Sequence, residues 1–536
     1  MRARRAAREV AAAPPNPCSG TARTRCAPGP RPQESKNGEH RAGKGGRRVN
    51  GSGVRPSPGG GGSAVAVLGA GISGLVAAWE LERLGHDVVV LEADTRIGGR
   101  VFTHRFAGSG GPRAELGAMR ISPDHAMTLR YIERLGLRSR LRPFANILSD
   151  PNNQLRLGRR LLRVRDAAGP LARETEVRAG GGPHRPDALL FTGWLHAMVR
   201  ALGPAELRVV VRRDLGKLLA VAGRFDLVPF VEGGRADVGA ALSAHPELRA
   251  ACDPRLEGFL DDLLRESGRG MVRLAGGMSQ LTDGIAARLR RPVRTGHEVT
   301  GIDVRPDGVR VRLGGRLAPA AVTYPVVLCT IPFSVLRRLP LTGVTDDKLE
   351  VIRTLDYGSA TKVALHCRTA FWTDEGITGG GSAPGGRVRQ TYYPPADGDP
   401  AAGAALLGSY TIAEDADVLG RMPSARRHAT VLGELRDLHP QLGPPPAVRE
   451  IVSVAWGERP WYRGCAARRW GLTEAGRARE AERTARPEGR LFFAGEHCSA
   501  TPAWIDAGIE TALDAVTRID TFTRRGGVPG DAGVPA

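Results

Sequence analysis

The clearest hydrophobic pattern in the chain begins near residue 65. An apolar run at residues 65–68 leads directly into a glycine-rich turn, and an Ala/Leu-rich stretch of helical period follows. A second apolar run, at residues 87–91, ends in an acid, Glu92. This order predicts a strand, a tight turn, a helix, a second strand and a carboxylate, which together are typical of a dinucleotide-binding unit.

The turn has the glycine spacing that such a unit requires. Gly69 permits the tight turn, Gly71 lets the backbone approach a pyrophosphate, and Gly74 lets the helix pack closely on the strand. The helix N-terminus offers free N–H groups to the phosphates, and Glu92 lies where a carboxylate can accept the ribose hydroxyls. The predicted cofactor contacts of this unit are Gly69, Gly71, Ile72, Ser73, Gly74, Glu92 and Ala93.

Patterns further along the chain predict its organisation. Residues 160–264 alternate Leu/Ala-rich helical periods with Gly and Pro breaks, which favours a helical insertion. Residues 333–485 contain several runs of strand period. An apolar run at residues 326–331 ends at Pro332, which cannot continue the interior of a sheet.

Three further motifs add candidate chemistry. Residues 95–100 read TRIGGR and residues 115–120 read ELGAMR. The paired glycines allow close backbone approach, and Arg100 can pair with a phosphate as a bidentate donor. Residues 490–497 read RLFFAGEH, a predicted strand that closes on a Gly-Glu turn, and a helix is predicted at residues 504–516.

Together these motifs resemble the flavin amine oxidase family, which contains monoamine and polyamine oxidases, L-amino acid oxidases and amino acid 2-monooxygenases. The resemblance extends from about residue 64 to residue 518. It implies an α/β (α+β) fold with a Rossmann-like FAD-binding domain, a mixed-sheet substrate domain and a helical insertion. It also implies FAD bound by Glu92, Arg100 and Glu496. The further FAD contacts that it implies are Gly99, Gly117, Ala118, Met119, Arg120, Val299, Gly495, Trp504 and Ile505.

The family fold interrupts its FAD-binding domain twice, so this domain is expected in residues 64–120, 265–332 and 486–520. The other expected parts are a disordered basic tail at 1–62, a substrate-binding domain at 121–159 and 333–485, the helical insertion at 160–264, and a loose C-terminal tail at 525–536. The N-terminal tail is rich in Pro, Gly, Arg and Ser and almost lacks aromatic residues, a composition typical of disorder.

Arg120 is the candidate for substrate recognition. It ends the ELGAMR motif, directly after backbone that is expected to touch the flavin. A bound amino acid needs a planar cation for its carboxylate, which arginine supplies bidentately. In L-amino acid oxidases and 2-monooxygenases, an arginine at this position holds the substrate carboxylate. The alternative is a structural ion pair, because a chain with 72 arginines places one by chance easily.

Lys362 is a candidate catalytic residue because lysine is so scarce. The chain has five lysines, and this one lies in a run of strand period at residues 357–367. The family places a lysine here, bound through a water to flavin N5, where it can assist reoxidation by O2. The alternative is a solvated lysine on a strand.

Three aromatic residues are candidates for walls around the substrate. Aromatic residues make up 5% of the chain, and Trp504, Tyr392 and Tyr393 lie in the two regions from which the family builds an aromatic cage. Such a cage positions the reacting carbon and excludes water. The alternative for all three is packing in the core.

Cys465 raises the question of how the flavin is held. It falls near the position at which monoamine oxidases attach flavin covalently, but the residues that follow it depart from that pattern. The expected state is therefore a buried, unreactive thiol and a noncovalent FAD, with a covalent link as the alternative.

Composition bounds the remaining possibilities. The net charge of +21 could indicate a nucleic-acid partner, but the basic residues are almost all arginine, and residues 1–62 alone hold 13 basic and 3 acidic residues. No recognition module or interleaved aromatic residues accompany them, so no specific nucleic acid is expected. No apolar run is long enough for a membrane span, and the seven cysteines lack metal-like spacing. A cytoplasmic enzyme with reduced cysteines is expected, and whether it forms a homodimer is left open.

The sequence thus predicts an FAD-dependent enzyme that oxidises the α-amino group of an L-amino acid. Hydride transfer to flavin N5 and reoxidation by O2 would give a 2-oxo acid, ammonia and H2O2. The first alternative is an amino acid 2-monooxygenase, which residues 134–137 and 142–146 also resemble. The others are a monoamine or polyamine oxidase, which Arg120 argues against, and a nucleic-acid-binding or scaffold protein.

Overall fold

The computed structural model describes residues 62–108, 110–268, 270–315, 319–395, 398–443 and 445–526. The predictions for the N-terminal tail and for the C-terminal tail fall outside these residues, except at the edges of the two tails.

A four-stranded parallel sheet carries the glycine turn. Its order is β2-β1-β14-β23, with β1 at Ala64–Leu68, β2 at Asp87–Leu91, β14 at Val326–Cys329 and β23 at Leu491–Phe493. The central strands are covered on both faces, which explains their continuous apolar sequences. The strands predicted around residues 65, 87, 326 and 491 are therefore confirmed as members of one sheet.

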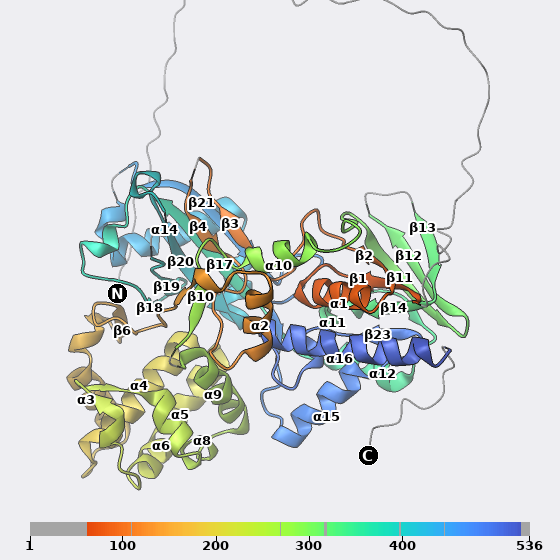
Figure 1. Ribbon diagram of the computed structural model, residues 1–536. Helices are drawn as coiled ribbons and strands as arrows, with labels where there is room; N and C mark the ends of the chain where they lie inside the picture. The colour runs from red at the N-terminus through yellow and green to blue at the C-terminus, as the bar shows by residue number, and fades with distance from the viewer. Residues whose placement is uncertain are drawn as a thin grey trace, which may run out of the picture. The chain divides into compact units, whose positions relative to one another are not determined.

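Two helices from opposite ends of the chain pack together on this sheet (Figure 1). They are α1, Ile72–Arg83, and α16, Ile505–Arg524. Their apolar faces share one core with the sheet, in which Leu75, Ile509 and Ala512 are fully buried. The N-termini of both helices thus come to the same edge of the sheet, where parallel strands end.

The other face of the sheet is covered by a smaller sheet and two helices. The sheet has the order β13-β12-β11-β15, and its longest strand, β11, spans Glu298–Arg305. The remaining elements are β12 at Gly308–Gly314, β13 at Ala320–Tyr324, β15 at Leu341–Thr342, α11 at Phe333–Leu336 and α12 at Asp346–Thr354.

A seven-stranded mixed sheet forms a second body of structure, on the left of Figure 1. Its order is β21-β17-β20-β19-β18-β6-β7. The strands are β21 at Val448–Ala455, β17 at Ala360–Cys367, β20 at Ala404–Ile412, β19 at Arg389–Tyr392, β18 at Gly381–Gly385, β6 at Gln154–Leu157 and β7 at Arg160–Arg163. Strand β17, predicted from its period, is buried along its whole length.

The helical segment lies below this sheet in Figure 1. Its helices are α3 at Ala168–Arg178, α4 at Pro186–Leu202, α5 at Ala205–Arg213, α6 at Leu215–Ala222, α7 at Val238–Ala244, α8 at Glu247–Ala250 and α9 at Pro254–Ser267. The insertion was expected to begin at residue 160, whereas residues 160–163 form β7. They pair with β6 through a turn at Gly158, whose φ of 58° favours glycine.

Short elements connect these bodies and carry several site residues. They are the hairpin β3–β4 at Thr103–Arg105 and Arg113–Glu115, the pair β5–β10 at Leu141–Pro143 and Val272–Leu274, the pair β16–β22 at Tyr357–Gly358 and Ala466–Ala467, and the helices α2 at Ala126–Arg134, α10 at Ser279–Ala286, α13 at Ala413–Gly420, α14 at Ser424–Leu438 and α15 at Glu474–Ala485.

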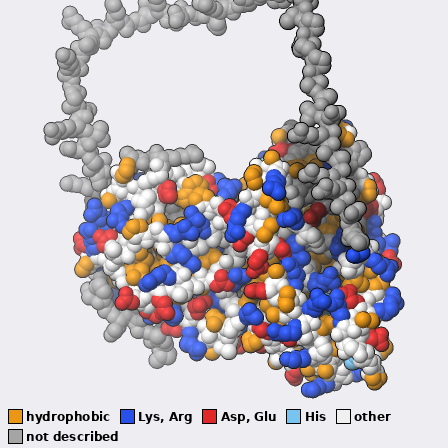
Figure 2. Space-filling model, turned by 180° about the vertical axis from the view of Figure 1, so that it is seen from behind, with side chains coloured by type: hydrophobic (Ala, Val, Ile, Leu, Met, Phe, Trp, Pro, Cys, Tyr) orange, Lys and Arg blue, Asp and Glu red, His pale blue; other side chains and the backbone are white. Residues whose placement is uncertain are grey.

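The described surface mixes charges of both signs. Figure 2 shows basic and acidic side chains interspersed, and many of them form ion pairs, such as Arg208–Asp415 at 2.6 Å. Among the described helices, none is both long and apolar enough to cross a membrane. The cytoplasmic location and the homodimer stay predictions.

Candidate active site

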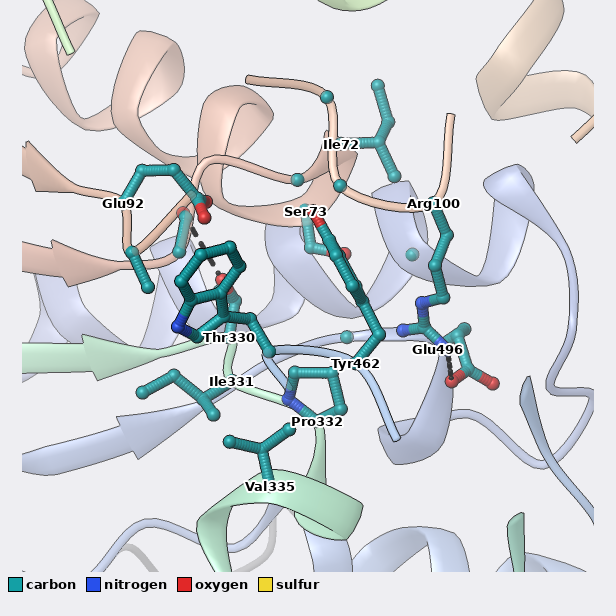
Figure 3. A pocket seen from close by; sticks show the side chains of 18 of the residues that line it. Ile72, Ser73, Glu92, Arg100, Thr330, Ile331, Pro332, Val335, Tyr462 and Glu496 are labelled. Atoms are coloured by element: carbon teal, nitrogen blue, oxygen red, sulfur yellow. Dashed lines mark hydrogen bonds and ion pairs between the residues drawn. The ribbon is translucent and has the colours of Figure 1, made fainter. Parts of the chain in front are cut away.

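A cavity of about 330 Å³ opens at the edge of the parallel sheet where its strands end. Figure 3 shows its walls, with Glu92 on one side and the Arg100–Glu496 pair on the other. Most of the predicted cofactor contacts line this cavity: Gly69, Gly71, Ile72, Ser73, Glu92, Ala93, Gly99, Arg100, Ala118, Val299, Gly495, Glu496, Trp504 and Ile505. The chain therefore brings together residues that lie far apart in sequence.

The N-terminus of α1 forms the floor of this cavity. Its N-cap is Gly71. No side chain caps the helix, and the first turn contains no acidic residue. Gly69 has a φ of +106°, and a Cβ on Gly74 would lie 2.0 Å from the carbonyl oxygen of Gly69. Only glycines fit this approach of turn and helix, so the uncapped N–H groups remain open to an anion such as a pyrophosphate.

Glu92 lies at one end of the cavity. Its carboxylate accepts hydrogen bonds from the backbone N–H of Ala70 at 2.7 Å and of Asp94 at 2.8 Å. Burial raises the pKa of Glu92, and these two N–H groups oppose that rise. The carboxylate is thus held rigidly beside the glycine turn, where it can accept ribose hydroxyls.

An ion pair lies at the other end. Arg100 Nη1 donates to Glu496 Oε1 at 2.6 Å and to the carbonyl of Cys465 at 2.9 Å. Glu496 also accepts from the backbone N–H groups of Ala467 and Ala503. Burial is the largest single effect and acts to raise the pKa of Glu496, but the charge of Arg100, together with His497 and the hydrogen bonds to the carboxylate, lowers the pKa overall. This anion stays ionised and fixes Arg100 at the cavity wall.

Backbone behind this pair is packed so closely that it requires glycine. A Cβ on Gly117 would lie 2.1 Å from the carbonyl oxygen of Arg100, so this segment can pack only as glycine. The uncapped helix, the acid at one end and the cationic, glycine-lined end opposite fit a dinucleotide that lies along the cavity.

Several wall residues were not predicted from the sequence, among them Tyr462 and the Thr330–Pro332 segment. Tyr462 donates its hydroxyl to Asp94 at 3.1 Å and lies under the guanidinium of Arg96. Thr330 donates to the carbonyl of Leu68 at 2.9 Å, directly at the glycine turn. Pro332, which ends the β14 run, was the available signal for this wall.

Arg120 and Tyr392, both candidates for the substrate site, lie in contact. Arg120 is 8% exposed, its Nη1 donates to the Tyr392 hydroxyl at 3.5 Å, and its guanidinium lies 5.9 Å from the ring centre of Phe144. Tyr392 and Phe144 both line a second cavity of about 120 Å³. A buried guanidinium beside a tyrosine hydroxyl and an aromatic ring is suited to bind a carboxylate.

Lys362 contacts the same segment from the mixed sheet. Its Nζ donates to the carbonyl of Gly117 at 2.7 Å and to that of Glu115 at 3.3 Å, and lies 3.4 Å from Met119 Sδ. Its Nζ also lies 4.6 Å from the ring centre of Tyr410, its partner across the β17–β20 pair. The sequence analysis missed Tyr410, although the strand pairing would have placed it beside Lys362.

The three predicted aromatic residues lie at two cavities. Trp504 lines the first cavity, and its ring lies edge-on to His125 at 4.7 Å between ring centres. Tyr392 and Tyr393 both line the second cavity. Tyr393 is 1% exposed, and its hydroxyl is within 2.8 Å of both Ser382 Oγ and His439 Nε2, so it also joins a buried network. The role of the three residues as substrate walls stays a prediction.

Cys465 lies at the wall of the first cavity. Burial raises the pKa of its thiol to about 11, although the nearby Arg100 acts to lower it. The thiolate is the reactive form, so this cysteine is a poor nucleophile near neutral pH.

Comparison with known proteins identifies the family. The sequence profile of the flavin containing amine oxidoreductases matches residues 72–520, and the chain belongs to this family. It is therefore a flavin-dependent oxidoreductase, and the prediction of family, fold class and enzyme class is confirmed.

Two relatives and one solved structure are similar to this chain over most of its length. The flavin-dependent L-tryptophan oxidase RebO of Lentzea aerocolonigenes is 50% identical over 462 residues, which cover 85% of this chain and 98% of that protein. An L-amino-acid oxidase of Mus musculus is 31% identical over 487 residues, which cover 85% of this chain and 70% of the relative. Wild-type putrescine oxidase bound to putrescine has a TM-score of 0.56 at 20% identity, covering 86% of this chain and 99% of that one, a likeness of fold.

Proposed function

We propose that this enzyme is an FAD-dependent L-amino acid oxidase that acts on L-tryptophan or an aromatic amino acid of similar size. Flavin-dependent oxidation of an L-amino acid, predicted from the sequence, is confirmed by the relatives. The choice of an indole side chain is our inference from the relative that is 50% identical and carries that substrate in its name.

The observation that carries the proposal is the buried guanidinium of Arg120. It lies at the end of the segment that Lys362 holds, beside the Tyr392 hydroxyl. A simple amine offers this cation no partner, whereas an amino acid offers a carboxylate that Arg120 can bind bidentately. Arg120 would thus fix the orientation of the substrate and leave its Cα–H toward the flavin.

FAD fits the first cavity and would supply the redox chemistry, because it accepts a hydride equivalent from the substrate and passes two electrons to O2. In this proposal the N-terminus of α1 holds the pyrophosphate, Glu92 the ribose, and Arg100 with Glu496 lies near the ring system. Trp504 excludes water from one side of the flavin cavity. Lys362 holds an ammonium proton against the segment at Gly117.

The domain boundaries belong to the same proposal. We assign FAD binding to residues 64–120, 265–332 and 486–520, substrate binding to residues 121–163 and 333–485, and the helical insertion to residues 164–264. The four strands of the parallel sheet and β11 support the first assignment. The position of β7 moves the start of the insertion to residue 164.

The test is a substrate panel with product analysis. L-tryptophan, D-tryptophan, tryptamine and L-leucine are compared by H2O2 release, and the products are identified by mass spectrometry. We expect L-tryptophan to be oxidised best and to give the 2-oxo acid and ammonia. Equal turnover of tryptamine would replace the proposal with an amine oxidase, and a decarboxylated amide would replace it with a 2-monooxygenase.

A further inference from the structure

Ala503 has a backbone conformation that alanine rarely adopts. Its φ is +75°, in the left-handed region, and it directly precedes Trp504, the N-cap of α16 and a wall of the first cavity. A Cβ disfavours this region, so such a residue persists only where surrounding contacts hold it. Trp504 itself is extended, with a φ of −115° and a ψ of 151°. The turn at Ala503 therefore sets the direction from which the chain enters Trp504 and α16.

A single carboxylate supplies a contact of this kind. Ala503 donates its backbone N–H to Glu496 Oε2 at 3.1 Å. The same oxygen accepts from the backbone N–H of Ala467 at 3.2 Å, and Oε1 accepts from Arg100 at 2.6 Å, the pair drawn in Figure 3. Glu496 is buried, so water competes little for these bonds. A hydrogen bond to a charged acceptor is stronger than one between neutral groups, which suits a contact that must offset backbone strain.

A second contact restrains the ring of Trp504. The ring lies edge-on to that of His125, the N-cap of α2, whose Nδ1 accepts from the backbone N–H of Ser122 at 3.2 Å. The start of α2 is tied to the start of α16, because Asp506 Oδ1 accepts from the backbone N–H and the hydroxyl of Thr128 at 2.6 Å and 2.8 Å. The Trp504 ring thus packs against a histidine whose helix is fixed to α16.

We propose that Glu496 positions Trp504 through Ala503: its carboxylate holds Ala503 in the left-handed conformation and thereby places the Trp504 ring at the first cavity. The same carboxylate fixes Arg100, so the cationic wall and the aromatic wall of that cavity are coupled through one side chain. This inference rests on the proposed role of Trp504 as a wall of the flavin cavity. It makes Glu496 and Ala503 positioning residues for the aromatic wall.

The position of Trp504 can be measured without substrate, because the chain has seven tryptophans. The holoenzyme is labelled with 5-fluorotryptophan and studied by 19F NMR, and the Trp504 signal is assigned by its loss in Trp504→Phe. Trp194 is the internal control. It is buried in α4, its Nε1 donates to the carbonyl of Gly234 at 2.9 Å, and its signal should stay in place in every variant.

Two substitutions at Ala503 have opposite expected effects. Proline fixes φ at about −65° and removes the N–H, so Ala503→Pro abolishes both the left-handed conformation and the bond to Glu496. The Trp504 signal should shift, and kcat/KM for L-tryptophan should fall about tenfold or more, because the wall is misplaced. Ala503→Gly keeps the conformation without steric cost, so the Trp504 signal should stay at its parent position. A parent-like Trp504 signal in Ala503→Pro would overturn the proposal.

Glu496→Gln tests the carboxylate, with all variants compared at equal flavin content. Glutamine has one acceptor oxygen in place of two, so it cannot keep the bonds to Arg100 and to Ala503 in their present places. We expect the Trp504 signal to shift in Glu496→Gln and to return toward its parent position in Glu496→Gln/Ala503→Gly, because glycine adopts a positive φ without support. An unshifted signal in the single variant, or an equal shift in the single and the double variant, contradicts the proposal.

Ala413→Gly is the matched control for this rescue. Ala413 also has a positive φ, of 50°, but it starts α13, which packs on β17 and β20. Glu496→Gln/Ala413→Gly should leave the Trp504 signal displaced, and a signal restored there would contradict the proposal. Turnover separates this inference from the proposed function. A displaced Trp504 signal with full turnover of L-tryptophan in Ala503→Pro would support the positioning of Trp504 and refute its role as a substrate wall.

Discussion

Arg120 combines charge with a fixed geometry. It is held between the Tyr392 hydroxyl and the Phe144 ring, and little solvent reaches it. A guanidinium in such a setting discriminates by the shape of its partner as well as by its charge. Substitutions at Arg120 should therefore separate the contribution of charge to substrate recognition from that of geometry.

Arg120→Met should leave the flavin bound and reduce kcat/KM for L-tryptophan by about a hundredfold or more, because a buried charge pair with the substrate is lost. Arg120→Lys should recover only part of this loss, since a point charge cannot form two parallel hydrogen bonds. Steady-state kinetics with flavin content as the reference measure both. The control is Arg130→Met, an exposed arginine on α2, and a loss below about threefold in Arg120→Met would contradict the assignment.

Cys465 allows a test of how the flavin is held. The raised pKa of its thiol, about 11, leaves little thiolate at neutral pH, so we expect a noncovalent flavin. Acid precipitation should release the flavin into the supernatant in the parent enzyme and in Cys465→Ala alike. Flavin that stays in the pellet and disappears from it in Cys465→Ala would show a covalent bond.

The candidate site residues that could be predicted from sequence alone are those that depend on local motifs. Glu92 and Arg100 follow the glycine turn at short spacing, and Glu496 follows a strand. Tyr410 and Tyr462 were not predicted because their positions in the site depend on partners that are distant in sequence. Tyr410 becomes relevant only through its pairing with Lys362, and Tyr462 only through its hydrogen bond to Asp94.

At the scale of elements, the α1 turn depends on the absence of side chains. Gly74→Ala would place a Cβ 2.0 Å from the Gly69 carbonyl oxygen, so helix and turn must separate. We expect a loss of about 2 kcal/mol in the free energy of unfolding and weaker flavin binding, measured by thermal denaturation and flavin titration. A variant with unchanged flavin affinity would exclude the close approach.

Gly433→Ala is the matched control for this substitution. Gly433 lies in the interior of α14, it is exposed, and no atom beyond its chain neighbours and its own helix backbone lies within 4 Å of an added Cβ. Alanine there should stabilise the protein by about 0.5–1 kcal/mol, because glycine loses more backbone entropy on folding. Changes of opposite sign in the free energy of unfolding for the two substitutions would separate the effect of crowding from that of helix propensity.

The helices and strands could be predicted where the hydrophobic period and the flanking glycine or proline residues agree. The strands of the parallel sheet and the helix α16 follow directly from their apolar runs and glycine turns. Strand β7 was missed because two leucines in a four-residue run fit a helix as well as a strand, and only the Gly158 turn distinguishes them.

At the scale of the whole molecule, two buried histidines should lower the stability of the fold in acid. His196 on α4 is 5% exposed and His497 is fully buried, and burial is the main cause that lowers the pKa of each to about 3. Below the ordinary value of 6.5 the unfolded chain binds protons that the folded chain excludes. Stability should therefore fall as the pH drops from 6.5 toward 3, by about 1.4 kcal/mol per pH unit for each histidine.

His196→Gln should make this decline shallower, because a neutral side chain has no proton to gain. Urea denaturation at pH 7, 6, 5 and 4 measures the slope. The control is His184→Gln, in the loop before α4, which should leave the slope as it is in the parent protein. Equal slopes for the parent and His196→Gln would exclude His196 as a source of acid lability.

The strand order β2-β1-β14-β23 has a consequence for how the enzyme is made. A ribosome releases the glycine turn early, whereas β23, Glu496 and α16 emerge only after all strands of the seven-stranded sheet. Arg100 must wait for its partner Glu496 while the intervening chain, a separation of 396 in residue number, is translated. Flavin capture therefore follows synthesis of the seven-stranded sheet, and a yellow protein reports a chain in which α16 was made.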